Sequence, residues 1–235
     1  MSDRLRRRKS LIIAAVALAL AVTTVTGLAY ADGRPLYLPL TMKPATGPLV
    51  QVSGRVLLQG RDDHAGATLY AGNSPVAQTR SDGSFSFTYY LPARDTAQLR
   101  IVAACRAYLW AETTLSIDGR TVFELPDVCL LAGDVAGPDS VVVTPPAGCP
   151  STEPVQVPGP PDGIVNIFDL TVISTHEGKS SSDPEWGPDP CHPGVPYLAH
   201  RADVNGDGQV DPRDYAIALQ NVGKTAPLPW VPCSE

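Results

Sequence analysis

The chain has 235 residues, a formal net charge of −6 and a sequence pI near 5.2. Its length, its 24 prolines and its low aromatic content (6%) favour two small domains over one large core. The sequence contains no basic patch with interleaved aromatic residues, so we expect no nucleic-acid partner.

Residues 1–31 have the pattern of a signal peptide. The basic run Arg6–Lys9 precedes the mostly apolar, uncharged stretch Leu11–Leu28, and Ala29-Tyr30-Ala31 is a small-x-small cleavage sequence. We therefore predict a secreted or extracellular protein associated with the cell surface. The alternative is a retained membrane anchor, because the apolar stretch is nearly long enough to span a bilayer. A membrane contact is expected only through this segment, if it is uncleaved.

Residues 32–48 are predicted to be a linker. The apolar patch Leu36–Leu40 within it is either a first strand or a tether close to the membrane.

Residues 49–131 are predicted to form a β-sandwich, because many short alternating segments follow one another at regular spacing. Asp82-Gly83 lies between two of them and predicts a hairpin. The predicted strands are Val50–Leu58, Ala67–Ala71, Val76–Arg80, Ser84–Tyr90, Gln98–Ala104, Thr113–Ile117 and Val122–Leu130.

Three segments of this domain, Val52–Val56, Gly66–Leu69 and Ser81–Phe87, resemble the carboxypeptidase regulatory-like family, which has a transthyretin-like β-sandwich. The resemblance implies an accessory module and not a catalyst. No catalytic residue and no site for an organic cofactor is assigned anywhere in the chain.

The β domain contains two groups of residues that are candidate binding or catalytic sites, one polar and one aromatic. Asp62-Asp63-His64 is interpreted as a solvated loop, with a metal or acid–base cluster as the alternative. Four aromatic residues are interpreted as strand packing, with a sugar-stacking platform as the alternative; they are Tyr89, Tyr90, Tyr108 and Trp110.

Residues 132–235 contain the strongest signal, the stretch Asp203–Asp214. Oxygen-bearing side chains fall at loop positions 1, 3, 5, 9 and 12, and Gly208 takes position 6, where the loop must turn sharply. This is the spacing of an EF-hand-type loop, which wraps Ca²⁺ in oxygen ligands. The predicted ligands are Asp203, Asn205, Asp207, the Gln209 carbonyl, Asp211 and Asp214.

An earlier stretch repeats this pattern. Asp162–Asp169 aligns without gaps with Asp207–Asp214, and a short helix and a Gly-Lys pair are predicted after each. The loop would begin at Asp134 and be interrupted by an insertion, residues 138–161. If the insertion loops out, a second Ca²⁺ has the ligands Asp134, Asp162, the Ile164 carbonyl, Asn166 and Asp169. Position 3 is Ala136, which offers no side-chain oxygen, so occupancy of this loop stays open.

A duplicated calcium loop, each copy followed by one helix and closed by Asp, resembles the dockerin family, the calcium-dependent module of bacterial cellulosomes. The resemblance covers residues 132–230 and predicts a multidomain fold, β then α, with a short-helix domain. It implies docking to a cohesin-type protein in extracellular polysaccharide degradation. Loop positions 10 and 11 depart from the Ser/Thr pairs common in that family, since they are Ile167-Phe168 and Pro212-Arg213.

The predicted function is therefore that of a secreted, non-catalytic, calcium-binding attachment protein. The alternative is a calcium-stabilised structural or carbohydrate-binding surface protein without a cohesin partner, with polysaccharide as the ligand of the sandwich.

Five cysteines leave at least one without a partner in the chain. A bond between Cys105 and Cys129 would staple the β domain. Two of Cys149, Cys191 and Cys233 could also pair, and a Cys149–Cys191 bond would hold the insertion. Trp186 and Trp230 are interpreted as hydrophobic plugs on the small helical core, with surface anchors for a partner as the alternative.

Overall fold

The computed structural model describes residues 26–31, 34–39, 48–91, 98–149, 153–183, 186 and 198–232. The chain divides into two compact units, Met1–Thr46 and Gly47–Glu235. Within the part of the chain that is described, none of the helices has the length and hydropathy needed to span a membrane.

The first unit contains an antiparallel hairpin of β1 (Thr26–Ala31) and β2 (Arg34–Pro39). The predicted cleavage point after Ala31 lies at the end of β1, and β2 overlaps the apolar patch for which the sequence allowed a strand. Residues 1–25 of the predicted signal peptide lie outside the described residues.

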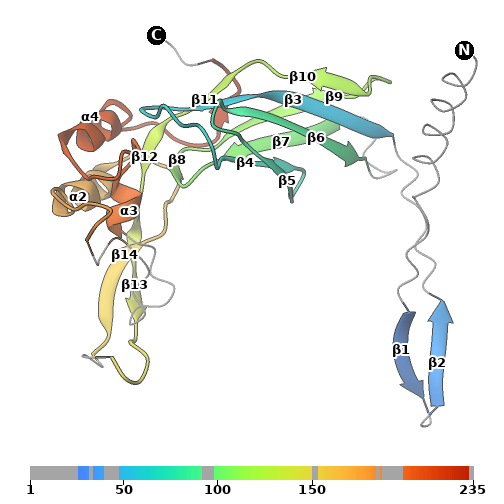
Figure 1. Cartoon of the computed structure of the whole chain (residues 1–235), viewed down its shortest axis with the longest axis horizontal. Helices are drawn as coiled ribbons and strands as arrows, with labels where there is room; N and C mark the ends of the chain where they lie inside the picture. Colours follow the sequence, from blue (N-terminus) through green and yellow to red (C-terminus); the bar gives the residue numbers. More distant parts are fainter. Residues whose placement is uncertain are drawn as a thin grey trace, which may run out of the picture. The chain divides into compact units, whose positions relative to one another are not determined.

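The second unit is built on two sheets, which are coloured cyan to yellow-green in Figure 1 except for a short red strand near the C-terminus. In the first sheet β3 (Leu49–Leu58) pairs with β6 (Ser84–Tyr90) in antiparallel fashion, and with β10 (Val122–Glu124) and β11 (Val128–Leu130) in parallel fashion. The second sheet has the order β15-β9-β7-β4-β5. Its strands are β4 (Thr68–Ala71), β5 (Ser74–Gln78), β7 (Gln98–Ala104), β9 (Ala111–Ser116) and β15 (Leu228–Pro229). The predicted β-sandwich is confirmed.

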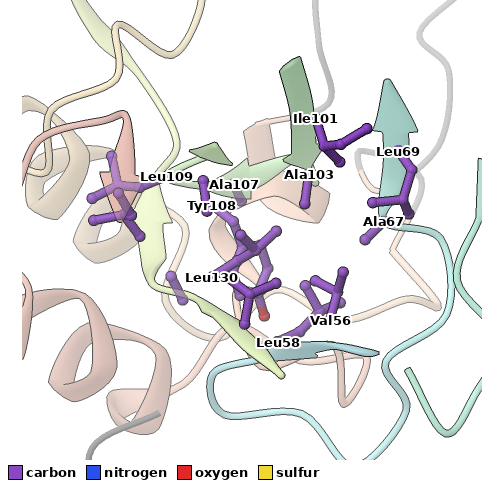
Figure 2. Close-up of a cluster of buried hydrophobic side chains, with 14 of the residues drawn as sticks. Val56, Leu58, Ala67, Leu69, Ile101, Ala103, Ala107, Tyr108, Leu109 and Leu130 are labelled. Atoms are coloured by element: carbon purple, nitrogen blue, oxygen red, sulfur yellow. The ribbon is translucent and has the colours of Figure 1, made fainter. Parts of the chain in front are cut away.

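The core of the sandwich follows from alternation along the strands, because successive side chains of a strand point to opposite faces. Val56 and Leu58 of β3 are buried, as are Leu69 of β4 and Ile101 of β7. Figure 2 shows these side chains gathered in one cluster.

Two predictions about these strands are wrong. The turn at Asp82-Gly83 forms, but β5 and β6 belong to different sheets, so the turn is a corner and not a hairpin. The local turn signal is the same in both cases, and pairing with distant strands decides between them. The segment Val122–Leu130 is two short strands, because Pro126 lacks the N–H that a continuous ladder requires.

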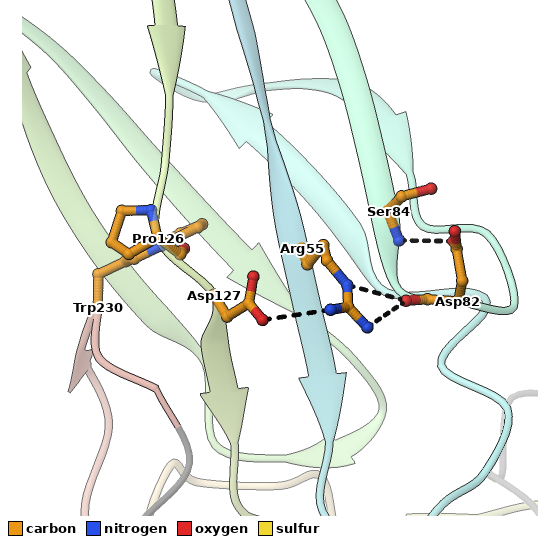
Figure 3. A network of polar contacts seen from close by, with 6 residues as sticks. All are labelled: Arg55, Asp82, Ser84, Pro126, Asp127 and Trp230. Atoms are coloured by element: carbon orange, nitrogen blue, oxygen red, sulfur yellow. Dashed lines mark hydrogen bonds and ion pairs between the residues drawn. The ribbon is translucent and has the colours of Figure 1, made fainter.

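A polar network fixes the corner to the first sheet. The Arg55 guanidinium donates to the Asp82 carbonyl (3.3 Å) and contacts the Asp127 carboxylate (3.4 Å), while the Asp82 side chain accepts from the Ser84 N–H (Figure 3). Asp127 lies in the break between β10 and β11, so Arg55 connects that break to the corner.

The remainder of the second unit carries three short helices. They are α2 (Ile167–Thr175), α3 (Leu198–Ala202) and α4 (Pro212–Gln220). Helix α2 packs against α4 and α3, and α4 packs against β12 (Ala132–Asp134), which pairs with β8 (Ala107–Tyr108). The inserted residues form the hairpin of β13 (Gly137–Val143) and β14 (Val155–Gly159), which extends from this region (Figure 1).

The sandwich and the loop–helix region are joined by direct contacts. The Asn221 amide, at the end of α4, donates to the Gln59 side chain (2.6 Å) and to the Ala132 carbonyl (2.7 Å). Strand β15, near the C-terminal end, returns to the sandwich beside β9. The two regions therefore fold as one compact unit.

The tryptophan and cysteine predictions need correction. Trp230 packs on the sandwich and not on the helices: its Nε1 donates to the Pro126 carbonyl, and its ring meets Phe85 edge-on. Trp186 contacts His200 of α3, as predicted for a residue that packs on the helices.

Cys105 is a free thiol, so the Cys105–Cys129 staple is not formed. Cys129 and Cys149 each take part in a disulfide, and the predicted partner of Cys149, Cys191, lies outside the described residues.

Candidate metal centre

The second predicted loop, Asp203–Asp214, is wrapped around two buried carboxylates. Asp203 is 3% exposed, and its two oxygens accept backbone N–H groups from Gly206 (2.7 Å), Asp207 (3.2 Å) and Gly208 (3.0 Å). Both glycines have positive φ, a conformation that favours residues without a Cβ.

Asp214 closes the loop from the first turn of α4. It is fully buried, and it accepts N–H groups from Val204 (2.9 Å), Asn205 (3.1 Å) and Asp211 (2.8 Å). Asp211 caps the helix by accepting the Arg213 N–H, so the pair forms a reciprocal capping box. The predicted position-9 and position-12 ligands therefore also start the helix.

Burial raises the pKa of both carboxyls. Loss of hydration disfavours the charged form, which raises the pKa of Asp214 to about 6 and raises that of Asp203 as well. Among the described residues, neither carboxylate has an ion pair with a Lys, Arg or His side chain. The loop thus concentrates negative charge, which attraction by Arg61 offsets only in part at Asp203.

The first predicted loop repeats this hydrogen-bond scheme. Asp169 is fully buried and accepts N–H groups from Val135 (2.7 Å), Ala136 (2.8 Å) and Asn166 (2.7 Å). Asn166 caps α2 and forms the matching capping box with Asp169. Asp162 accepts from the Ile164 N–H (3.0 Å), as Asp207 accepts from Gln209 (3.0 Å).

The structure brings the two separated halves of the first loop together. Asp134 accepts the Gly163 N–H (3.1 Å) across the insertion, and a Cβ on Gly137 would lie 2.7 Å from the Pro160 carbonyl. The insertion therefore leaves the loop at Gly137 and returns at Pro160. One Asp134 oxygen, Oδ1, is buried and has no hydrogen-bond partner. Burial, with repulsion from Asp169 and Asp162, raises the Asp134 pKa to about 7.

Each loop is hydrogen-bonded to the residues that follow the helix of the other repeat. Val165 of the first loop exchanges backbone hydrogen bonds with Lys224 (3.1 Å) and Gly223 (2.8 Å), which follow α4. Val210 of the second loop makes the same exchange with the pair that follows α2, Lys179 and Gly178 (2.8 Å each). Each predicted Gly-Lys pair thus supports the loop of the other repeat.

The sandwich contacts the second loop through Arg61, which the sequence did not single out, and through Tyr108, for which it suggested strand packing or a sugar platform but not this contact. The Tyr108 hydroxyl donates to the Val204 carbonyl (2.6 Å), and Arg61 Nε donates to the same carbonyl (3.3 Å). The Arg61 guanidinium also lies over the Tyr108 ring, 5.4 Å from its centroid. Only a long-range contact places them there, so no local pattern could have identified them.

The other sequence candidates form no separate site. His64 accepts the Leu58 N–H, and Asp63 accepts the Ala65 N–H, so both act in the turn between β3 and β4. Tyr108 is buried under the second loop, Trp110 lies against Gly163 and Tyr90 is exposed, so the aromatic residues do not form one platform. One polar cleft of about 360 Å³ is lined by Asp62 and Asp63 together with Asn205 and Asp207 of the second loop.

Across the described residues, no three His, Cys, Asp or Glu side chains converge as a metal cluster. The loop carboxylates point to backbone N–H groups instead. Asn205 and the carbonyls of Gln209 and Ile164 belong to the predicted ligand sets but not to these four residue types.

Two solved structures share this fold. Each is a type II cohesin–X–dockerin complex from Acetivibrio cellulolyticus, one with a C-terminal and one with an N-terminal interface mutation. The matching chain of each has 20% identity, covers 75% of this chain with 97% of its own length, and superposes with a TM-score of 0.51. No protein-family model and no curated protein matches the sequence. At this identity the likeness concerns the fold alone.

Proposed function

We propose that this chain is an extracellular, non-catalytic attachment module that binds Ca²⁺ in the loop Asp203–Asp214 and docks to a protein partner of the cohesin type. The observation that carries the proposal is the duplicated loop–helix unit with its shared hydrogen-bond scheme.

The residues of the second loop fit a calcium ion. Two carboxylates that are 97% or more buried form no ion pair with a described side chain, and such charges are costly unless paired or bound to a metal. The ion would be held by Asp203, Asn205, Asp207, the Gln209 carbonyl, Asp211 and Asp214. When bound, Ca²⁺ supplies positive charge that cross-links the loop to the start of α4.

The extent of the structural match favours the dockerin side of such a complex. A match over 75% of 235 residues is about 176 residues, whereas Leu49–Leu130 spans 82. It therefore extends beyond the sandwich into the loop–helix region, even if the whole first unit is included. The resemblance of the sandwich to the carboxypeptidase regulatory-like family stays a prediction.

The docking surface proposed here begins at the first turn of α2. Ile167 is 65% exposed and Phe168 is 46% exposed, although both are large and apolar. Exposed aromatic and aliphatic side chains that become buried on binding contribute most of the affinity of many interfaces. Their place at loop positions 10 and 11 links the partner surface to the calcium loop.

The test is calorimetric titration of the full chain with a panel of type II cohesin domains, in calcium and in EDTA. We expect binding in calcium and its loss in EDTA. The variant Phe168→Ala should weaken binding by at least about tenfold, as expected for an interface anchor. Val142→Ala is the matched control, because Val142 is 64% exposed on the inserted hairpin.

Failure of every cohesin to bind would overturn the docking role. If Ca²⁺ still raised the melting temperature, the calcium-stabilised structural alternative would stand, and a glycan array would then test the sandwich for polysaccharide binding.

A further inference from the structure

A buried cation lies beside the first loop. Arg201 of α3 is 1% exposed, and one of its nitrogens, Nη2, donates to the Gly159 carbonyl at 3.4 Å. Its Nε and Nη1 atoms are buried and have no hydrogen-bond partner. A buried guanidinium is nearly always paired, so this arrangement calls for an anionic partner.

The first loop has a matching unpartnered atom. Asp134 is 2% exposed, and its Oδ1 accepts no hydrogen bond. The equivalent Asp203 oxygen in the second loop accepts from Gly206 and Asp207. The difference arises because the insertion replaces the tight turn that provides these donors.

The two groups belong to one electrostatic environment. Gly159 ends β14, where the insertion returns to the first loop, so its contact with Arg201 places the guanidinium at that junction. Burial, together with repulsion from Arg106, lowers the pKa of Arg201 to about 10, whereas attraction by Asp134 and Asp169 raises it. Helix α3 also packs against α2, which carries Asp169.

We infer that the Arg201 guanidinium is the built-in counter-ion of the first loop, in the role that Ca²⁺ takes in the second. The first loop then needs no metal, which agrees with Ala136 at position 3, where a side-chain ligand is missing. The chain accordingly binds one Ca²⁺, at Asp203–Asp214. Only this stoichiometry rests on the proposed function; the Arg201–Asp134 coupling does not.

The first experiment is a double-mutant cycle on the full chain, measured by denaturant unfolding in calcium. The variants are Arg201→Met, Asp134→Asn and both together. We expect the effects on the unfolding constant to be non-additive by at least about tenfold, which is about 1.4 kcal/mol. Arg100→Met is the matched control and should combine additively with Asp134→Asn, because Arg100 pairs with Glu112 on the sandwich and not with the first loop. Additive effects for Arg201 would overturn the inference.

The second experiment counts Ca²⁺ by calorimetry and stays informative if Arg201→Met does not fold. We expect one ion for the wild type and for Asp134→Asn, and none for Asp214→Ala. Two ions in the wild type, with one lost in Asp134→Asn, would show that the first loop binds metal and would overturn the inference. No ion in the wild type would refute the proposed function, and the cycle alone would then decide the role of Arg201.

Discussion

The two loops of this chain share one backbone scheme, and we propose that they differ in how their buried charge is neutralised. In both, an Asp at position 12 is fully buried, accepts three backbone N–H groups and forms a capping box with position 9. They differ in residue type at position 3, where Asn205 corresponds to Ala136, and in the insertion that separates position 4, Gly137, from position 5, Asp162. The hydrogen-bond framework of such a loop is therefore separable from its set of metal ligands.

The largest expected effect comes from removing the position-12 carboxylate in each loop. Asp214→Ala and Asp169→Ala each leave three N–H groups without an acceptor and remove a cap, so each should cost about 3 kcal/mol or more. Only Asp214→Ala should abolish Ca²⁺ binding. Urea unfolding and calorimetry on both variants test this; equal loss of calcium binding in both would show that the loops do not differ as we describe.

The next largest difference is expected at the position-6 glycines, where the same substitution should destabilise the first loop more than the second. Both have positive φ, but a Cβ on Gly163 would lie 2.6 Å from the Trp110 ring, whereas one on Gly208 would lie 3.3 Å from the Ser181 hydroxyl. We expect Gly163→Ala to cost about 3 kcal/mol and Gly208→Ala about 1 kcal/mol, because only the first adds a clash with a rigid ring to the backbone strain. Thermal melts in calcium measure the difference, and the reverse order would contradict it.

Contact with the sandwich should matter for the second loop in particular. Tyr108→Phe removes the hydroxyl that donates to the Val204 carbonyl, at a cost of about 1–2 kcal/mol. We expect a weaker affinity for Ca²⁺, because Val204 lies between the ligands Asp203 and Asn205. Tyr90→Phe is the control, since Tyr90 is 47% exposed. An unchanged calcium affinity in Tyr108→Phe would mean that the sandwich does not preorganise the loop.

Much of this comparison was accessible from the sequence. The spacing of oxygen-bearing residues and Gly208 identified the second loop, and the ungapped echo at Asp162–Asp169 identified the first. Both signals are local, because a loop that wraps one ion or caps one helix uses residues close in sequence. The alternation in Val50–Leu58 likewise predicted a strand with one buried face.

What the sequence did not predict depends on distant partners. The turn at Asp82-Gly83 has the same local chemistry in a hairpin and in a corner between sheets. Arg201 carries a charge that local patterns assign to the surface, and only packing of α3 beside α2 buries it. Strand β15 is two residues long and has no local strand signal.

The smallest effect is expected for a substitution that makes the second loop resemble the first at position 3. Asn205→Ala reproduces the Ala136 position by removing a predicted ligand, while the N–H of residue 205 still donates to Asp214. Without calcium we expect a loss of about 1 kcal/mol or less, from the bond that Asn205 accepts from the Asp207 N–H. With calcium, the loss should grow by about 1.4 kcal/mol for each tenfold decrease in affinity, because a ligand stabilises only the state that binds it. Unfolding at several calcium concentrations separates the two contributions. An equal loss at every concentration would show that position 3 contributes only to the framework, and the missing oxygen at Ala136 would then not explain an empty first loop.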